Sequence, residues 1–125
     1  MRTGFGKSVA AGGCLYFLAV GVWAFVDPRT FFTSVAQWPP YNAHFLRDIG
    51  ALSMGLGMGL AIVLTPMGGG QAVLGTAAAA AIAHTASHVL DYGRGGGVAD
   101  PYFFGFLALL LVVGWVIEGR RSGCE

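Results

Sequence analysis

Three long stretches of this chain contain no charged side chain, and they limit what it can fold into more than any other feature. No Asp, Glu, Lys or Arg lies between Lys7 and Asp27, between Asp48 and Asp91, or between Asp100 and Glu118. A helix needs roughly 20 mostly apolar residues to cross a bilayer, so the middle stretch can hold two spans and each of the others one. The stretches show no two-residue alternation, which argues against strands. We therefore expect an all-α polytopic membrane protein, a bundle of four transmembrane helices.

The composition agrees with this interpretation. Apolar residues make up 55% of the chain and charged residues 10%, whereas an ordinary soluble domain has about 25% charged residues. A chain of 125 residues exposes a large surface for its volume and would need charge to cover that surface in water. The net charge of +1 provides no field that would gather nucleic acid. The partner we expect for the outer surface is the lipid bilayer, with no nucleic acid bound.

The ends of the helices can be read from turn and capping residues. We expect one membrane domain over residues 1–125, with helices at about 8–26, 43–64, 71–91 and 101–118. A Pro-Gly turn at 65–70 follows the second helix, and a Gly-rich stretch at 93–97 follows the third. Asn42 and Asp100 are placed to cap the second and fourth helices, and Pro101 suits a first helical turn.

The segment between the first two helices, residues 28–41, has a different character. It carries four aromatic side chains, Phe31, Phe32, Trp38 and Tyr41. Aromatic rings concentrate at the level of the lipid headgroups, so we expect this segment to lie in the membrane interface.

The basic residues predict the orientation of the chain. With four spans both termini share a side; that side holds Arg2, Lys7, Arg120 and Arg121, and the other holds Arg29, Arg47 and Arg94. The excess at the termini favours a cytoplasmic location for both. Arg2 and Lys7 also fit the start of a signal peptide, but the apolar run after Cys14 is long, so we expect an uncleaved first span. Cys14 and Cys124 then occupy positions that favour neither a disulfide nor a metal site.

Small residues recur along the second expected helix at the spacing that lets helices approach closely in lipid. Two such rows are present: Ala51, Gly55 and Gly59, and Ser53, Gly57 and Ala61. The rows fit tight packing within one chain, and they also fit a contact surface for another membrane subunit or a second copy. Both interpretations stay open at this point.

The polar residues of the spans carry whatever chemistry the protein has. They form two groups at helical spacing: His44, Arg47 and Asp48 at the start of the second helix, and His84, His88 and Asp91 at the end of the third. Residues at i, i+4 and i+7 share a helical face. Because successive helices run in opposite directions, both groups lie at the same membrane face, where Asp27, Arg94 and Asp100 also lie. Ionisable groups within spans usually face the bundle interior or water.

Several kinds of site are compatible with these residues. His44, His84 and His88 could bind a metal ion or haem, or could pass protons or hold a small ligand. Alternatively, the group is an interfacial polar network in which Arg47 pairs with an acid such as Asp91. The H-x-x-x-H spacing lacks the glutamate of the zinc-protease motif, because Thr85 follows His84.

Two short motifs resemble a known family. The run 21–28, GVWAFVDP, and the run 47–51, RDIGA, which opens a Gly-rich helix, resemble the small four-helix DoxX-like bacterial membrane proteins. The resemblance implies a four-helix bundle in the bacterial inner membrane. Some members of that family are accessory subunits of quinone-linked oxidoreductases, and the resemblance carries no catalytic residue to a position of this chain.

The function we expect is therefore a small integral membrane protein that serves as a non-catalytic accessory or structural subunit of a larger membrane complex. The alternatives are a metal- or haem-binding redox enzyme of the membrane, and a protein that handles protons or a small ligand with its His and Asp side chains. The sequence does not decide whether the chain is an enzyme, and it identifies no particular cofactor or substrate.

Overall fold

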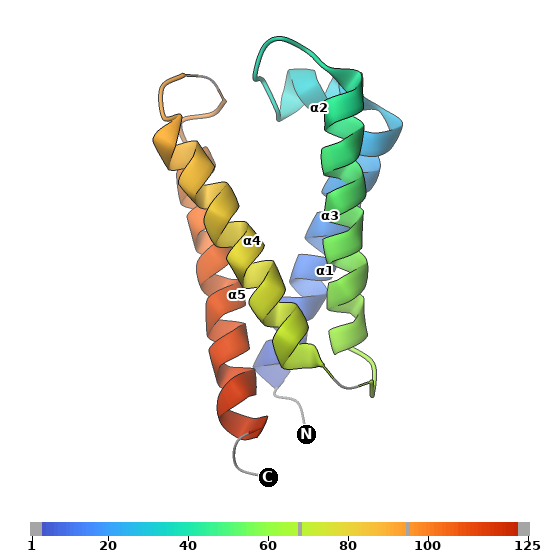
Figure 1. Ribbon diagram of the computed structural model, residues 1–125, viewed down its shortest axis with the longest axis vertical. Coiled ribbons are helices and arrows are strands. Elements are labelled where there is room, and N and C mark those ends of the chain that lie inside the picture. The colour runs from blue at the N-terminus through green and yellow to red at the C-terminus, as the bar shows by residue number, and fades with distance from the viewer. Residues whose placement is uncertain (1–3, 68, 95, 123–125) are drawn as a thin grey trace.

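The computed structural model describes residues 4–67, 69–94 and 96–122, and in these ranges the chain is helical with no strand. Figure 1 shows five helices in the described part. They are α1 (Gly4–Val26), α2 (Pro28–Ser34), α3 (Ala43–Val63), α4 (Gly70–Leu90) and α5 (Asp100–Ser122). The predicted all-α class is confirmed.

Four of these helices are long and apolar enough to cross a membrane: Gly4–Val26, Ala43–Val63, Gly70–Leu90 and Asp100–Arg120. The chain is thus a multi-pass membrane protein. Its first and last helices are longer than the sequence predicts, because α1 begins at Gly4 and α5 continues to Ser122. The start of α3 follows the expected cap, since the Asn42 side chain accepts a hydrogen bond from the Phe45 amide at 3.1 Å.

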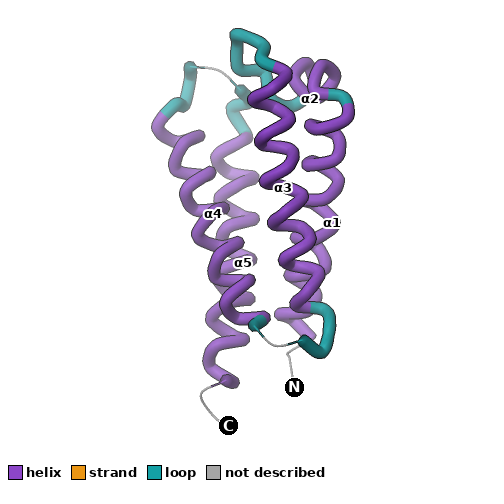
Figure 2. Tube along the Cα trace, turned by 45° about the vertical axis from the view of Figure 1, so that its right-hand side comes forward, coloured by secondary structure: helices purple, strands orange, loops and turns teal. Residues whose placement is uncertain are grey.

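The long helices form two antiparallel pairs, α1 with α3 and α4 with α5. Figure 1 shows the pairs close together at the end where α1 begins and α5 ends, and apart at the end that carries α2, and Figure 2 shows the four long helices from a second direction. The main core contains Leu60, Val63, Leu74 and Leu111, which are almost fully buried among small alanines. These residues lie at the closed end, where α3 finishes and α4 begins. The other end is held by a smaller cluster of Ala24, Phe31 and Leu46.

Glycines bring the backbones of α1 and α3 into contact. A Cβ atom placed on Gly50 would lie 2.7 Å from the Gly21 carbonyl oxygen, and one placed on Gly21 would lie 2.8 Å from the Gly50 carbonyl oxygen. A Cβ on Gly57 would meet the Leu18 side chain at 2.8 Å. Close approach through small residues is the usual way that helices associate in lipid. This contact therefore runs along Gly50 and Gly57 of α3. Gly57 belongs to the predicted row of Ser53, Gly57 and Ala61.

The other predicted row faces away from this contact. Ala51 and Gly55 are exposed, and no atom lies within 4 Å of a Cβ placed on Gly55. Gly59 lies close only to Val73 of α4, at 3.7 Å. Ala51 and Gly55 therefore make no close helix contact within the chain, because the rotation of α3 turns them outward. Their use as a surface for another subunit stays a prediction.

The segment predicted to lie in the interface contains a short helix, α2. Asp27 caps it by accepting a hydrogen bond from the Thr30 amide at 3.2 Å, and Pro28 occupies its first turn. The indole of Trp23 donates to the Thr30 hydroxyl at 2.9 Å and packs edge-on against the buried Phe31. The helix α2 thereby packs against the α1–α3 pair at the end where α1 finishes and α3 begins.

Candidate functional site

A cavity of about 430 Å³ lies between the two helix pairs at the end where they diverge. All five helices and the α2–α3 loop line it. Its walls are mostly aromatic and aliphatic, and its polar lining comes from a few residues that include Ser53, His84, His88 and Asp100. A volume of this size and an apolar lining with few polar groups are typical of small-molecule sites.

Part of the cavity wall comes from α3. Two of its lining residues on that helix, Phe45 and Leu52, are 58% and 73% exposed. Since α3 is long and apolar enough to cross the membrane, these exposed side chains are placed to contact lipid. Another depression, of about 510 Å³, follows the outer face of α1 from Leu15 to Asp27. A single helix and its end line that depression, so it offers no converging polar groups.

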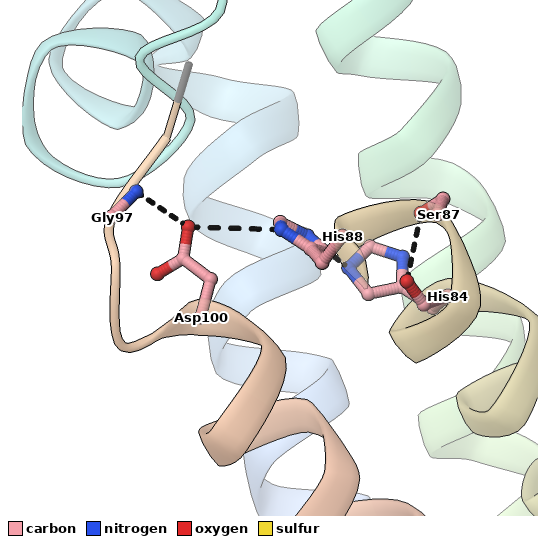
Figure 3. Close-up of polar contacts among 5 residues, drawn as sticks. All are labelled: His84, Ser87, His88, Gly97 and Asp100. Atoms are coloured by element: carbon pink, nitrogen blue, oxygen red, sulfur yellow. Dashed lines mark hydrogen bonds and ion pairs between the residues drawn. The ribbon is translucent and has the colours of Figure 1, made fainter. Parts of the chain in front are cut away.

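Three ionisable side chains form a row at the polar end of the cavity (Figure 3). The Nε2 atoms of His84 and His88 are 3.1 Å apart, and Nδ1 of His88 is 3.7 Å from Oδ2 of Asp100. The same carboxylate oxygen accepts a hydrogen bond from the Gly97 amide at 2.8 Å. The side chains of His88 and Asp100 are only 14% and 28% exposed. The row thus links α4, α5 and the loop between them.

The aromatic ring of Phe104 on α5 fixes the two imidazoles. It stacks on His88 with ring centroids 4.6 Å apart and meets the edge of His84 at 4.4 Å. On the other side, the Trp38 ring meets His88 edge-on at 6.1 Å. Trp38 also packs on Gly96, where φ is +70° and a Cβ would lie 2.7 Å from the indole nitrogen. Glycine is required there by both the positive φ and the contact.

The arrangement of the nitrogens limits the protonation states of the row. Because the two Nε2 atoms face each other, one must carry a hydrogen and the other must offer a lone pair. A hydrogen on Nδ1 of His88, directed at Asp100, leaves its Nε2 as the acceptor for Nε2–H of His84. The row can therefore bind a polar group, share a proton or hold a metal ion. It cannot hold one haem iron through both rings, since two axial ligands lie on opposite sides of the macrocycle.

The structure separates the predicted site residues. His84 and His88 line the cavity, whereas His44 pairs with Asp48 on the outer side of α3, at 3.6 Å and with side-chain exposures of 88% and 60%. His44 and Asp48 point outward because Leu46, two residues from each of them, and Gly50, two residues after Asp48, are buried on the opposite face of α3. The prediction that His44 joins the other two histidines is therefore wrong.

Arg47 and Asp91 also differ from expectation. The Nε atom of Arg47 donates to the Phe25 carbonyl at 3.3 Å, across the seam between α1 and α3. Asp91 contacts the guanidinium of Arg94 at 3.2 Å, just beyond the end of α4. The expected pair of Arg47 with Asp91 is therefore absent from the described part of the chain. Asp91 pairs with Arg94 instead, because Arg94 lies only three residues away along the chain.

Phe104 was not predicted as a site residue, and Asp100 was predicted only as a helix cap at the same membrane face. Asp100 was expected to cap the last helix, and instead it is the first residue of α5 and binds the preceding loop at Gly97. Asp100 stands at the start of a helix antiparallel to α4, so it is level with the end of α4 and lies beside His88. Nothing in the sequence distinguishes Phe104 from the other phenylalanines of α5.

Comparison with known protein families, with curated proteins and with solved structures found no match to this chain. The resemblance to DoxX-like proteins therefore stays a prediction that rests on the two sequence motifs. The cavity and its polar row are the features of the chain itself from which a function can be argued.

Proposed function

We propose that this protein binds a small amphipathic molecule that enters the cavity from the bilayer. One observation supports this most directly: an apolar cavity of about 430 Å³ ends at the polar row His84–His88–Asp100. A molecule with a hydrocarbon part and a polar head matches both ends of such a site. Ligand sites of this kind are mostly apolar, with a few placed polar groups that set orientation.

The polar head would contact the imidazole pair, and the hydrocarbon part would lie against the rings and aliphatic chains of the walls. Four different helices supply wall residues, among them Tyr16, Phe17, Phe32, Ile49 and Leu107. Burial of apolar surface against them contributes about 25 cal/mol per Å². The exposed Phe45 and Leu52, which line the cavity from the membrane-spanning α3, support entry of the ligand from the bilayer.

Filling the cavity from α4 tests this proposal. Ala80 lines the cavity, whereas its neighbour Ala79 is exposed and does not. The protein is purified in membrane nanodiscs, and co-purifying small molecules are identified by mass spectrometry. We expect Ala79→Trp to keep the bound molecule and Ala80→Trp to lose it. Equal occupancy in the two variants, or no stoichiometric molecule in the wild type, would rule the proposal out.

We also propose an accessory role in a larger membrane complex, as the sequence predicts. The outward position of Ala51 and Gly55 on α3 supports it, because small residues on a lipid-facing surface permit close contact with another helix. Gly55→Leu is expected to release a partner subunit on native purification without lowering the melting temperature of the chain. A partner retained by Gly55→Leu would contradict this surface. The two roles are compatible.

We further propose that the protein lies in the bacterial inner membrane with both termini in the cytoplasm. The distribution of Lys and Arg supports this orientation. Reporter fusions at residue 69 and after the last residue are expected to report the cytoplasm, and a fusion at residue 96 the outside. A fusion at residue 96 that reports the same side as the C-terminal fusion would contradict the topology.

A further inference from the structure

We infer that His84 and His88 form a binding site for a divalent transition-metal ion of the zinc or copper type, with the Nε2 atom of each ring as a ligand. This inference goes beyond the binding of an amphipathic molecule and does not depend on it. It rests on the distance between the two Nε2 atoms, on Asp100 near Nδ1 of His88, and on Phe104, which contacts both imidazoles.

The distance between the two nitrogens fits a shared ion. The Nε2 atoms are 3.1 Å apart. Two bonds of about 2.0–2.1 Å at a tetrahedral angle place two nitrogen ligands about 3.3 Å apart. An ion can therefore replace the hydrogen between the rings if they separate by about 0.2 Å and turn so that both lone pairs meet at one point. The i, i+4 spacing on α4 sets this proximity within a single helix.

Asp100 occupies the place of the group that usually orients a metal-bound histidine. Such a histidine donates its other ring N–H to a carboxylate, a carbonyl or water. Oδ2 of Asp100 is 3.7 Å from Nδ1 of His88, and the Gly97 amide holds that oxygen in position. The separation is longer than a direct hydrogen bond, so a small movement of the side chain is needed to form one. Asp100 is thereby a positioning residue, and Nε2 is left as the ligand.

Phe104 prepares the pair for binding. It contacts both rings at centroid distances of 4.4 and 4.6 Å. Rings that are already held lose less conformational freedom when an ion binds. Phe104 and the two histidines line one cavity, so the ion would be bound at the cavity wall.

The pair supplies two ligands and leaves the remaining coordination positions open. Among the residues that the structure describes, no group of three or more His, Cys, Asp or Glu side chains is arranged around one point. His44 cannot be the third ligand, because it faces outward on α3 with 88% of its side chain exposed. Water or the head of a molecule in the cavity would complete the coordination, as at metal sites that keep an open position.

Titration of the untagged full-length protein in nanodiscs with Zn²⁺ alone, and separately with Cu²⁺ alone, tests the site. We expect one tight ion per chain. His84→Gln and His88→Gln should each weaken binding at least tenfold, and Asp100→Asn by about tenfold. His44→Gln is the matched control, since it removes a histidine that also has a carboxylate neighbour, and it should leave the affinity unchanged. Circular dichroism establishes that each variant keeps its helices.

Electron paramagnetic resonance of Cu²⁺ on the wild-type protein tests the same site without relying on any variant to fold. The expected spectrum carries hyperfine splitting from two imidazole nitrogens, and His44→Gln should not change it. Splitting from one nitrogen or none would overturn the inference. So would a double variant of His84 and His88 that binds either ion as tightly as the wild type, or a His44→Gln variant that loses the site.

Discussion

Two polar pairs with the same spacing lie at the same end of this bundle and have opposite surroundings. His44 and Asp48 on α3 are 88% and 60% exposed and contact each other on the outer face. His84 and His88 on α4 line a cavity, and His88 is 14% exposed on its side chain. Spacing along a helix determines which residues are neighbours. The rotation of the helix about its axis determines what those neighbours face.

The small residues of each helix reveal that rotation. On α4 the buried Ala77 and Ala81 continue at helical spacing into His84 and His88. This stripe is buried where the helix pairs touch and borders the cavity where they diverge. On α3 the buried Gly50 and Gly57 lie on the face opposite His44 and Asp48. The outward face of α3 continues from that pair to Ala51 and Gly55.

The largest expected difference in stability is between two alanine variants of α3, one on its inner face and one on its outer face. In Gly50→Ala the new Cβ would lie 2.7 Å from the Gly21 carbonyl oxygen, so the backbones must separate at a cost of about 1–3 kcal/mol. In Gly55→Ala the new Cβ meets nothing within 4 Å, and the gain in helix propensity stabilises by roughly 0.5–1 kcal/mol. Thermal unfolding in detergent, followed by circular dichroism, should give shifts of opposite sign. Melting-temperature shifts of the same sign would contradict the rotation of α3 that turns Gly50 inward and Gly55 outward.

A smaller difference is expected between the two histidine pairs. His88→Ala removes contacts with Phe104 and Trp38, which are worth about 0.5–1.5 kcal/mol each. His44→Ala removes an exposed pair on a helix, worth about 0.3–0.5 kcal/mol. The same unfolding measurement should rank His88→Ala as the more destabilised variant. Equal melting temperatures would contradict the different surroundings of the two pairs.

The smallest effect concerns an exposed acid outside the membrane spans. Hydrogen bonds from Thr30 hold the pKa of Asp27 below its usual range. A lowered pKa means that the cap on α2 stabilises the fold fully above the pKa of the unfolded chain, about 3.9, and is lost as the pH falls through the folded pKa. The nuclear magnetic resonance signal of the Thr30 amide should titrate with that lower midpoint, and Asp27→Asn should abolish the titration. A midpoint at the ordinary pKa would show that these hydrogen bonds do not form.

The fold was predictable from the sequence because lipid restricts what each segment can be. The charge-free stretches had to be helices, and the bounds of α3 and α4 follow the turns and caps that surround them. The helix α2 was predicted only as an interfacial segment. Its start carries Asp27 followed by Pro28, the same capping pattern as Asp100 followed by Pro101, so the beginning of this helix was also predictable.

The site was predictable only where one helix determines it. His84 and His88 are neighbours because the α-helix repeats every 3.6 residues. The place of His44 depends on how α3 rotates against α1, and that rotation is set by the contact between Gly21 and Gly50. The cavity depends on how far the two helix pairs diverge, which no local pattern encodes. Asp100 enters the site through the same tertiary arrangement.

His84 and His88 face each other on one wall of the cavity, and His44 lies apart from them on the outer face of α3. Solid-state nuclear magnetic resonance of the protein in bilayers, with ¹⁵N-labelled histidine, measures this directly. We expect a ¹⁵N–¹⁵N correlation between the Nε2 atoms of His84 and His88, at the 3.1 Å separation of the structure, and none from His44 to either ring. A correlation from His44 to His84 or His88, or no correlation between the two rings of α4, would contradict the account.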